Sequence, residues 1–503
     1  MGATEELRER LGEIHDLSRA ASLLAWDERT MMPQGGAEAR TETLATLARV
    51  RHEMFIADEI GRLIDCARSE ADDVPPGESI DTDLVRVVSR DWNKARRVPS
   101  ELRADLARAS SIAETVWVEA KRESNFEMLL PNLTENVELT ERYADCFDGF
   151  PGFTHPYDPL LDEYEPEMTT EQMRAVLAEL REGLVPLVSE ATENGAGSED
   201  PFRGDFPPEA QRELIAELIS ELPFAEGSWR IDPTEHPFAI SIGRGDIRLT
   251  TRYDEANLAM SLFSALHEAG HGLYESGVDP ELQRTPLAKP RSLGLHESQS
   301  RFWENWVARS EPYLERHLPM LRERFPGAFE GIDADRLYRA ANRVERSLIR
   351  IEADEVTYNL HILIRFELEL EIFEGDLALA DLPEAWNARY RDYLGVEVPD
   401  DAHGVLQDVH WPSGAFGYFP TYSLGNIIAG QLWEAAGRDL GDLPALIGEG
   451  DLASIGGWLE ENVHRHGRRL SPGEILERAG CGELSVEPLL GHLRERVDLA
   501  IRA

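Results

Sequence analysis

Hydrophobic residues recur at helical spacing along most of the chain, and this pattern predicts a mainly α-helical protein. A T-x-x-Q capping box at Thr169 opens a periodic run that ends near Val188. A Pro-Pro pair precedes a predicted helix over residues 209–222, and Ser471 opens another helix that stops before Gly480. The sequence contains neither an internal repeat nor a low-complexity tract, so we expect one domain over residues 1–503.

One stretch departs from the helical pattern and predicts a small β-structure. Residues 238–242 and 247–253 alternate apolar and polar positions, as half-buried strands do. The turn between them, Gly243-Arg244-Gly245-Asp246, is typical of a hairpin. The hairpin directly precedes the helix that carries the most informative motif.

That helix is predicted to begin after Asp254 as its N-cap and to end at Gly277. It contains the run His267-Glu268-Ala269-Gly270-His271, an H-E-x-x-H motif. Helix positions four apart are separated by about 40° around the axis, so both imidazoles project from one face and can share a metal ion. A second stripe on this helix should pack into the core: Leu262, Leu266, Ala269 and Leu273.

Glu297 is the candidate for the third metal ligand that a catalytic zinc site requires. It stands 26 positions beyond His271, after a loop rich in Pro and Gly, and near the start of a new helix. A Glu in an acidic protein is more often a solvated surface residue. The apolar neighbours of this one argue for burial: Leu293, Leu295, Phe302, Trp303 and Trp306.

Composition restricts the class of partner. The chain has 95 acidic and 51 basic residues, so its formal net charge is -44 and it should repel nucleic acids and anionic membranes. Only three residues are Lys, and this acidic, Lys-poor composition predicts adaptation to concentrated salt, which screens like charges. A GC-rich genome that favours Arg codons is the alternative explanation.

Three dispersed cysteines and the absence of a secretory pattern or an apolar stretch of about 18 residues predict a soluble, cytoplasmic protein.

Several further motifs resemble, in order, those of the peptidase family M32 carboxypeptidases. They cover essentially the whole chain. They are His236-Pro237-Phe238, D-x-R-x-T at Asp246, Arg248 and Thr250, H-E-S-Q from His296 to Gln299, I-R-x-x-A-D-E from Ile349 to Glu355, G-x-x-Q-D-x-H-W from Gly404 to Trp411, and the aromatic run from Phe416 to Tyr422.

This resemblance implies a large helical zincin-like fold with a small sheet beside an active-site groove, and homodimeric assembly. It implies a carboxypeptidase that removes single amino acids from peptides with a free C-terminus. His267, His271 and Glu297 would hold one divalent ion per subunit, Zn²⁺ or alternatively Co²⁺. Glu268 would be the general acid/base toward a metal-activated water.

Substrate-binding residues are expected in the other motifs. Arg350 is the first candidate for holding the terminal carboxylate, because a guanidinium binds a carboxylate through two parallel hydrogen bonds. An internal ion pair with Asp354 is its alternative role. The other candidates are His236, His410, Tyr418 and Tyr422, of which the last three are proposed as oxyanion donors or, equally, as packed core groups.

Metal-bound histidines are usually oriented by a second acceptor, for which Asp354 and Asp408 are candidates. An oligopeptidase or aminopeptidase on the same metal ligands, and a non-catalytic binding protein, are the competing functions. Retention of Glu268 argues against the binding protein, because binding alone does not require that carboxylate.

Overall fold

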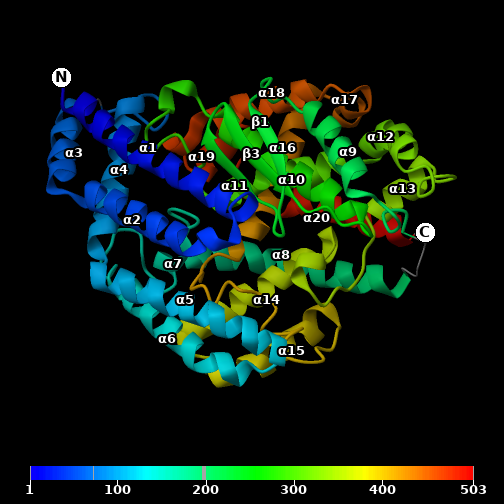
Figure 1. The fold of residues 1–503 in the computed structure, drawn as a ribbon, viewed down its shortest axis with the longest axis horizontal. Coiled ribbons are helices and arrows are strands. Elements are labelled where there is room, and N and C mark those ends of the chain that lie inside the picture. The colour runs from blue at the N-terminus through cyan, green and yellow to red at the C-terminus, as the bar shows by residue number, and fades with distance from the viewer. Residues whose placement is uncertain (1, 72, 195–199, 502–503) are drawn as a thin grey trace.

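The computed structural model describes residues 2–71, 73–194 and 200–501, and it is mainly helical with one small sheet, which confirms the predicted fold class. Figure 1 shows the sheet with α10, α16 and α18 in the upper part and α5, α6, α14 and α15 in the lower part. Among the described residues, no helix is long and apolar enough to cross a membrane.

The N-terminal half contains nine α-helices and the short 3₁₀ helix η1 Gln34–Gly36 among its described residues, and the sheet follows them. The helices are α1 Ala3–Thr30, α2 Ala37–Ile56, α3 Asp58–Glu70, α4 Ile80–Arg97, α5 Ser100–Glu123, α6 Phe126–Asp145, α7 Asp158–Asp162, α8 Thr170–Asn194 and α9 Pro208–Ser220. The strands are β1 Trp229–Pro233, β2 Ala239–Gly243 and β3 Asp246–Thr251.

The remaining elements carry most of the candidate site. Apart from the short 3₁₀ segments η2 Pro280–Leu282, η5 Leu379–Asp381 and η6 His464–Arg469, they are α10 Leu258–Gly277, α11 Leu293–Arg301, the π-helical segment η3 Phe302–Ala308, α12 Glu311–Arg324, α13 Ala334–Ala341, the 3₁₀ turn η4 Arg350–Glu352, α14 Glu355–Glu374, α15 Leu382–Leu394, α16 Pro420–Leu440, α17 Leu443–Glu449, α18 Leu452–Asn462, α19 Pro472–Arg478 and α20 Glu487–Ile501.

The sheet has the order β1-β3-β2. β2 and β3 pair antiparallel, with Ile240 opposite Arg248, which confirms the predicted hairpin. β1 pairs with β3 in parallel, with Ile231 beside Leu249. Because β2 lies at the edge, one side of its backbone has no partner strand within the described part of the chain.

Local signals at two helix starts are confirmed. The Thr169 hydroxyl accepts a hydrogen bond from the Gln172 amide at 3.3 Å, and the Gln172 side chain accepts one from the Thr169 amide at 3.0 Å. Ser471 and Glu474 form the same reciprocal box at α19. These bonds satisfy amide groups that a helix start leaves without intrahelical partners.

The predicted start of the metal helix is wrong by one turn, because α10 has Asn257 and not Asp254 as its N-cap. The Asp254 carboxylate instead accepts a hydrogen bond from the Ala256 amide at 2.8 Å, and its carbonyl accepts one from the Gln211 side chain at 2.8 Å. These contacts hold Asp254 in a turn before the helix.

Two large hydrophobic clusters form the core. One surrounds α10 and the sheet and includes Leu262, Leu266 and Trp303. The other surrounds α14 and includes Phe366 and Trp386. Helix α16 contributes to both clusters and packs along α11. The helix that carries Glu297 therefore lies between the two clusters.

Candidate metal centre and substrate groove

Helix α10 presents both histidines of the motif from one face, as its spacing predicts. The His267 and His271 rings have centroids 4.9 Å apart, and Glu268 between them is buried. The predicted apolar stripe is also buried: Leu262, Leu266, Ala269 and Leu273. Burial of that stripe holds the helix rigidly, so the imidazoles keep a fixed separation.

Glu297 completes a group of three possible metal ligands. The Nε2 atoms of His267 and His271 lie 3.6 and 3.4 Å from Glu297 Oε2. All three potential ligand atoms lie within 4.8 Å of one another. Two imidazole nitrogens and one carboxylate oxygen converging from two helices match the donor set of a catalytic zinc site. These residues therefore fit a single divalent ion.

Two glycines let helix α11 approach close enough to place Glu297. A Cβ atom on Gly270 would lie 2.5 Å from the Gln299 carbonyl oxygen, and one on Gly425 would lie 2.5 Å from Glu297 Cγ. Neither distance is possible for a larger side chain without movement of α11. Gly270 of α10 and Gly425 of α16 thus allow the close packing that places the third possible ligand.

Each histidine is oriented through its Nδ1 atom. His267 Nδ1 lies 2.9 Å from Glu304 Oε2, and His271 Nδ1 lies 3.1 Å from the His296 carbonyl oxygen. Both acceptors favour a proton on Nδ1, which leaves Nε2 free for a metal ion. Glu304 lies on η3, consistent with the frequent occurrence of π-helical turns at functional sites.

The sequence-based candidates for this orienting role, Asp354 and Asp408, are wrong. Asp354 caps α14 by accepting hydrogen bonds from the Val356 and Thr357 amides. Asp408 binds arginines instead. Glu304 was missed, although it stands seven positions after Glu297, a spacing that returns to nearly the same face of a helix.

The pKa values of the two buried glutamates of the site are shifted in opposite directions. Burial raises the pKa of the Glu268 carboxyl to about 7. Burial also opposes ionisation of Glu297, but the positive charge of Arg301, whose Nε donates to Glu297 Oε1 at 2.8 Å, outweighs it and holds the pKa of Glu297 well below its usual range. Ser300 adds a hydroxyl donor at 3.1 Å. Glu297 is therefore held as a carboxylate.

Arg350 is buried and pairs with Asp408, not with the predicted Asp354. Its Nη2 lies 2.7 Å and its Nε 3.0 Å from Asp408 Oδ1, and its Nη1 lies 3.3 Å from the Tyr358 hydroxyl. Arg365 binds the other Asp408 oxygen at 2.6 Å. Two guanidinium groups share one carboxylate, so this cluster carries one uncompensated positive charge.

The structure brings three further candidates together with Arg350. The Arg350 guanidinium lies 5.4 Å from the centre of the Tyr422 ring, and the Tyr418 and Tyr422 ring centres are 5.3 Å apart. His410 Nε2 lies 3.4 Å from the Tyr422 hydroxyl. Burial lowers the pKa of His410 to about 4, which leaves the ring neutral near pH 7.

Tyr358 connects this cluster to the three possible metal ligands. Its hydroxyl contacts Arg350, and its ring lies 4.8 Å below the guanidinium of Arg301, which binds Glu297. Its ring centre is also 6.1 Å from that of Tyr422. The Arg350 cluster and the three possible ligands therefore form one continuous polar site.

His236 is the candidate that the structure does not join to this site. It is exposed in the loop between β1 and β2. Among the described residues it has no hydrogen bond, ion pair or ring contact with the other candidates.

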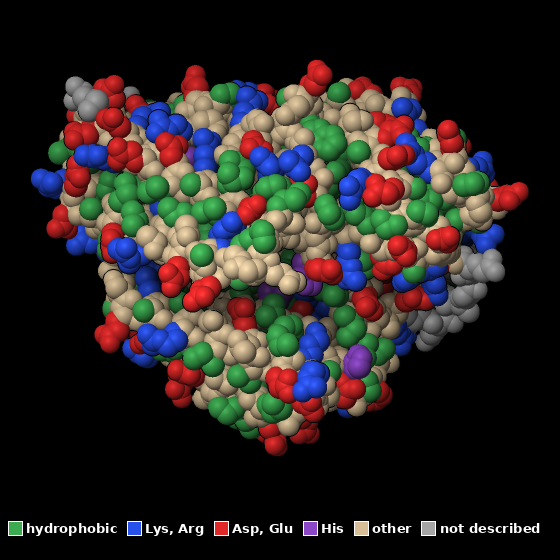
Figure 2. All heavy atoms as spheres, in the orientation of Figure 1, with side chains coloured by type: hydrophobic (Ala, Val, Ile, Leu, Met, Phe, Trp, Pro, Cys, Tyr) green, Lys and Arg blue, Asp and Glu red, His purple; other side chains and the backbone are tan. Residues whose placement is uncertain are grey.

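Figure 2 shows a hollow across the middle of the molecule in which histidine atoms are visible.

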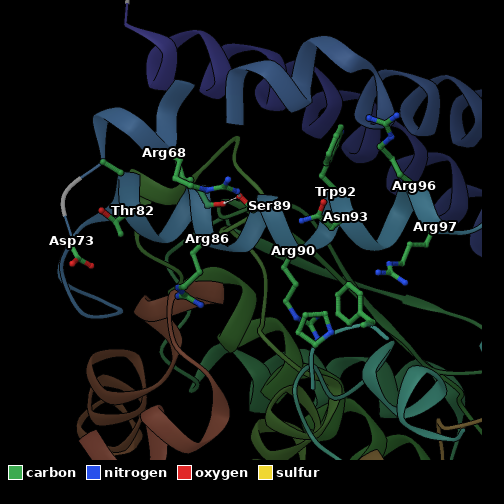
Figure 3. A pocket seen from close by; sticks show the side chains of 14 residues that line it. Arg68, Asp73, Thr82, Arg86, Ser89, Arg90, Trp92, Asn93, Arg96 and Arg97 are labelled. Carbon is green, nitrogen blue, oxygen red and sulfur yellow. Dashed lines mark hydrogen bonds between the residues drawn. The ribbon is translucent and has the colours of Figure 1, made fainter. Parts of the chain in front are cut away.

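A cavity of about 910 Å³ lies away from this centre, along α4. Figure 3 shows Arg68 of α3 reaching Ser89, while Arg86, Arg90 and Arg97 extend from the other side of α4. Arg90 is paired with Asp162 at 2.5 Å. None of the candidate site residues lines this cavity, so its size does not make it the active site.

Comparison with known proteins identifies the relatives of this chain. The Carboxypeptidase Taq (M32) metallopeptidase family matches residues 6–497. Thermostable carboxypeptidase 1 of Thermus thermophilus is 40% identical over 502 residues, covering 98% of each chain. Carboxypeptidase 1 of Bacillus subtilis is 38% identical over 494 residues, covering 98% of this chain and 97% of the relative. The crystal structure of the M32 carboxypeptidase from Deinococcus radiodurans R1 superposes with a TM-score of 0.95 at 38% identity, covering 100% of both chains.

Proposed function

The chain belongs to the Carboxypeptidase Taq (M32) metallopeptidase family and is a metal-dependent carboxypeptidase, and from this premise we propose that His267, His271 and Glu297 hold one Zn²⁺ ion per subunit, with Glu268 as general acid/base. The observation that carries the proposal is the convergence of the three ligand atoms within 4.8 Å, beside a buried carboxylate. Zn²⁺ suits this mixed nitrogen and oxygen donor set, and Co²⁺ is the alternative ion.

When bound, the ion supplies Lewis-acid polarisation of the scissile carbonyl and of a water molecule. Glu268 takes a proton from that water on its carboxylate and delivers it to the leaving amine. Its neighbour His267 is a ligand, so the carboxylate stands beside the reacting atoms. Its burial excludes bulk water, which would otherwise compete for the proton.

Arg350 binds the terminal carboxylate of the substrate in this proposal. The support is its charge: Asp408 neutralises only one of the two guanidinium groups of Arg350 and Arg365. An incoming carboxylate would compensate the remaining charge by accepting a hydrogen bond from Nη1 of Arg350, which contacts Tyr358 but not Asp408. A C-terminal amide lacks that charge and should bind poorly.

The remaining candidates take supporting positions. Tyr418, Tyr422 and His410 would donate hydrogen bonds to the oxygen that becomes negative during hydrolysis, since they form one cluster next to Arg350. His236 would contact the substrate backbone at the rim, because its loop leads directly into the edge strand β2.

The proposal also includes homodimeric assembly, a reducing cytoplasmic location and a high-salt environment. The three cysteines are all free thiols, which supports a reducing compartment. The net charge of -44 supports concentrated salt as the working medium. Homodimeric assembly follows from the resemblance of the motifs to the M32 family.

Metal analysis combined with three matched peptides tests this function. The purified protein should contain about one zinc per subunit. It should shorten a free-ended peptide one residue at a time, leave the C-terminally amidated peptide nearly intact, and cleave an N-acetylated peptide normally. Loss of cleavage on N-acetylation, with the amidated peptide cleaved, would instead indicate an aminopeptidase.

A further inference from the structure

A second cavity, of about 440 Å³, lies between α1, strand β2 and residues 283–296. Its lining is rich in positive charge, although acidic residues outnumber basic ones almost two to one in the whole chain. The basic lining residues are Arg19, Arg244, Lys289, Arg291 and Arg468, against Glu163 and Glu275. We refer to this cavity as the cationic chamber.

Most of the chamber's arginines are already engaged with other groups. Arg291 pairs with Glu167 at 3.0 Å, and Arg468 pairs with Asp91 at 2.7 Å. Arg19 donates a hydrogen bond to the Gln283 side chain.

Lys289 is one of three lysines in the protein, and it differs from the chamber's arginines in having no partner. Among the described residues, it makes no hydrogen bond, ion pair or ring contact. The titratable groups that interact with it electrostatically come from several elements: Glu275, Asp91, Arg468, Arg51 and His15. The residue is exposed toward the cavity, so its ammonium group is accessible to a ligand. An unpaired cation in a concave, cationic lining is suited to an anion.

The chamber adjoins the metal ligands through His296. The His296 ring lines the chamber and stacks on His271 at 4.3 Å between centroids, and the next residue is Glu297. The Arg350 cluster reaches the same ligands through a different route, by way of Tyr358 and Arg301. The Arg350 cluster and the cationic chamber are therefore connected to the proposed metal ligands through different residues.

Strand β2 can guide a substrate peptide between the Arg350 cluster and the cationic chamber. Residues 239–241 of β2 line the chamber, and β2 is an edge strand with one side of its backbone unpaired. An extended peptide can pair with such an edge through backbone hydrogen bonds. If Arg350 holds the C-terminal carboxylate, the residues on the other side of the scissile bond extend along β2 toward the chamber.

We propose that the cationic chamber is a specificity subsite in which the Lys289 ammonium binds an acidic side chain located N-terminal to the scissile bond. The inference rests on the proposed function, because it uses the orientation that Arg350 would impose on the substrate. It adds a preference that the metal ligands do not determine, namely for Glu or Asp over neutral or basic residues upstream of the cleaved bond.

Matched free-ended peptides that differ only by Glu or Gln at one position test this subsite. Each of the first four positions upstream of the scissile bond is varied in turn. The measured quantity is the ratio of kcat/KM for the Glu peptide to that for the Gln peptide. We expect a ratio of about tenfold at one position in the parent enzyme, as for a partly desolvated ion pair.

Three variants separate a subsite from a structural role. Lys289→Gln should lower the ratio to about one, and Lys289→Arg should preserve most of it. Lys289→Glu should reverse the preference, so that a peptide with Lys at that position becomes the better substrate. Arg62→Gln, on the exposed outer surface of α3, removes one positive charge elsewhere and should leave the ratio unchanged.

The outcomes distinguish this inference from the proposed function. If the parent cleaves neutral free-ended peptides but the ratio stays near one at every position, the subsite is refuted and the function stands. A ratio that Lys289→Gln does not alter, with metal content and melting temperature like the parent's, also refutes it. If no free-ended peptide is cleaved by the metal-loaded parent, the proposed function itself fails.

Discussion

Replacing Glu304 should weaken metal binding although Glu304 is not itself a ligand. Its Oε2 accepts from His267 Nδ1 at 2.9 Å and from Arg301 at 3.2 Å, and its Oε1 accepts from Arg309 at 3.2 Å. Loss of such an acceptor frees the imidazole to rotate or to change its tautomer. Comparable changes weaken metal binding by about 10- to 100-fold, or roughly 1.4 to 2.7 kcal/mol.

The size of the effect should depend on the substitution. Glu304→Gln keeps an oxygen that can face His267 but removes the negative charge, so we expect about tenfold weaker binding. Glu304→Ala removes the acceptor and leaves Arg301 and Arg309 without this counter-charge, so we expect about 100-fold weaker binding and a lower melting temperature.

Competition with a chelator of known affinity measures the zinc dissociation constant of the parent and of each variant. Glu355→Gln is the matched control, since Glu355 is similarly buried, lies 2.7 Å from His492 and 3.4 Å from Arg496, and contacts none of the ligands. Its variant should keep the parent's zinc affinity. Parent-like zinc affinity in Glu304→Gln would show that the contact with His267 does not orient the ligand.

Four further predictions follow from the site, the charge and the burial of single groups. Glu268→Gln should keep the metal and lose most of kcat, because it removes the proton carrier and no ligand; nearly full turnover would refute the mechanism. Arg350→Lys should lower kcat/KM for free-ended peptides far more than for amidated ones, because one ammonium cannot serve both Asp408 and a substrate carboxylate; equal losses on the two peptides would remove Arg350 from substrate binding. Melting temperature should rise as KCl increases to molar levels, because salt screens repulsion among the excess carboxylates; a value independent of salt would favour the codon-usage explanation. Burial raises the pKa of Glu165 to about 8, so the folded state holds a proton that the unfolded state loses above about pH 4.5, and the free energy of unfolding should fall by up to about 1.4 kcal/mol per pH unit from about pH 5 to pH 8. Chemical denaturation of Glu165→Gln should show a shallower decline over this range, and an unchanged slope would contradict the assignment.

The sequence alone determined the features that depend on short-range periodicity. Spacing of four placed His267 and His271 on one helix face, alternation predicted the hairpin, and the capping residues identified two helix starts. The ordered motifs identified the family. Each of these signals is local because helices and hairpins are formed by hydrogen bonds between residues close in the chain. The predicted start of α10 was wrong because Gln211, far away in sequence, holds Asp254 in a turn.

Only the tertiary structure decided which polar groups meet. The sequence offered Asp354 as the internal partner of Arg350, yet Arg350 pairs with Asp408, while Asp354 caps a helix. Glu304 reaches His267 only because helix packing brings η3 beside α10.

Long-range packing also placed Glu297, the third proposed ligand, and the cationic chamber. Glu297 occupies its position because Gly270 and Gly425 allow α11 to approach two helices closely. Lys289 lines the chamber together with residues of β2 and α1, which precede it by many positions in the chain. Such contacts depend on the shape and volume of the assembled core and leave no periodic signal in the sequence, and for that physical reason only the folded structure reveals them.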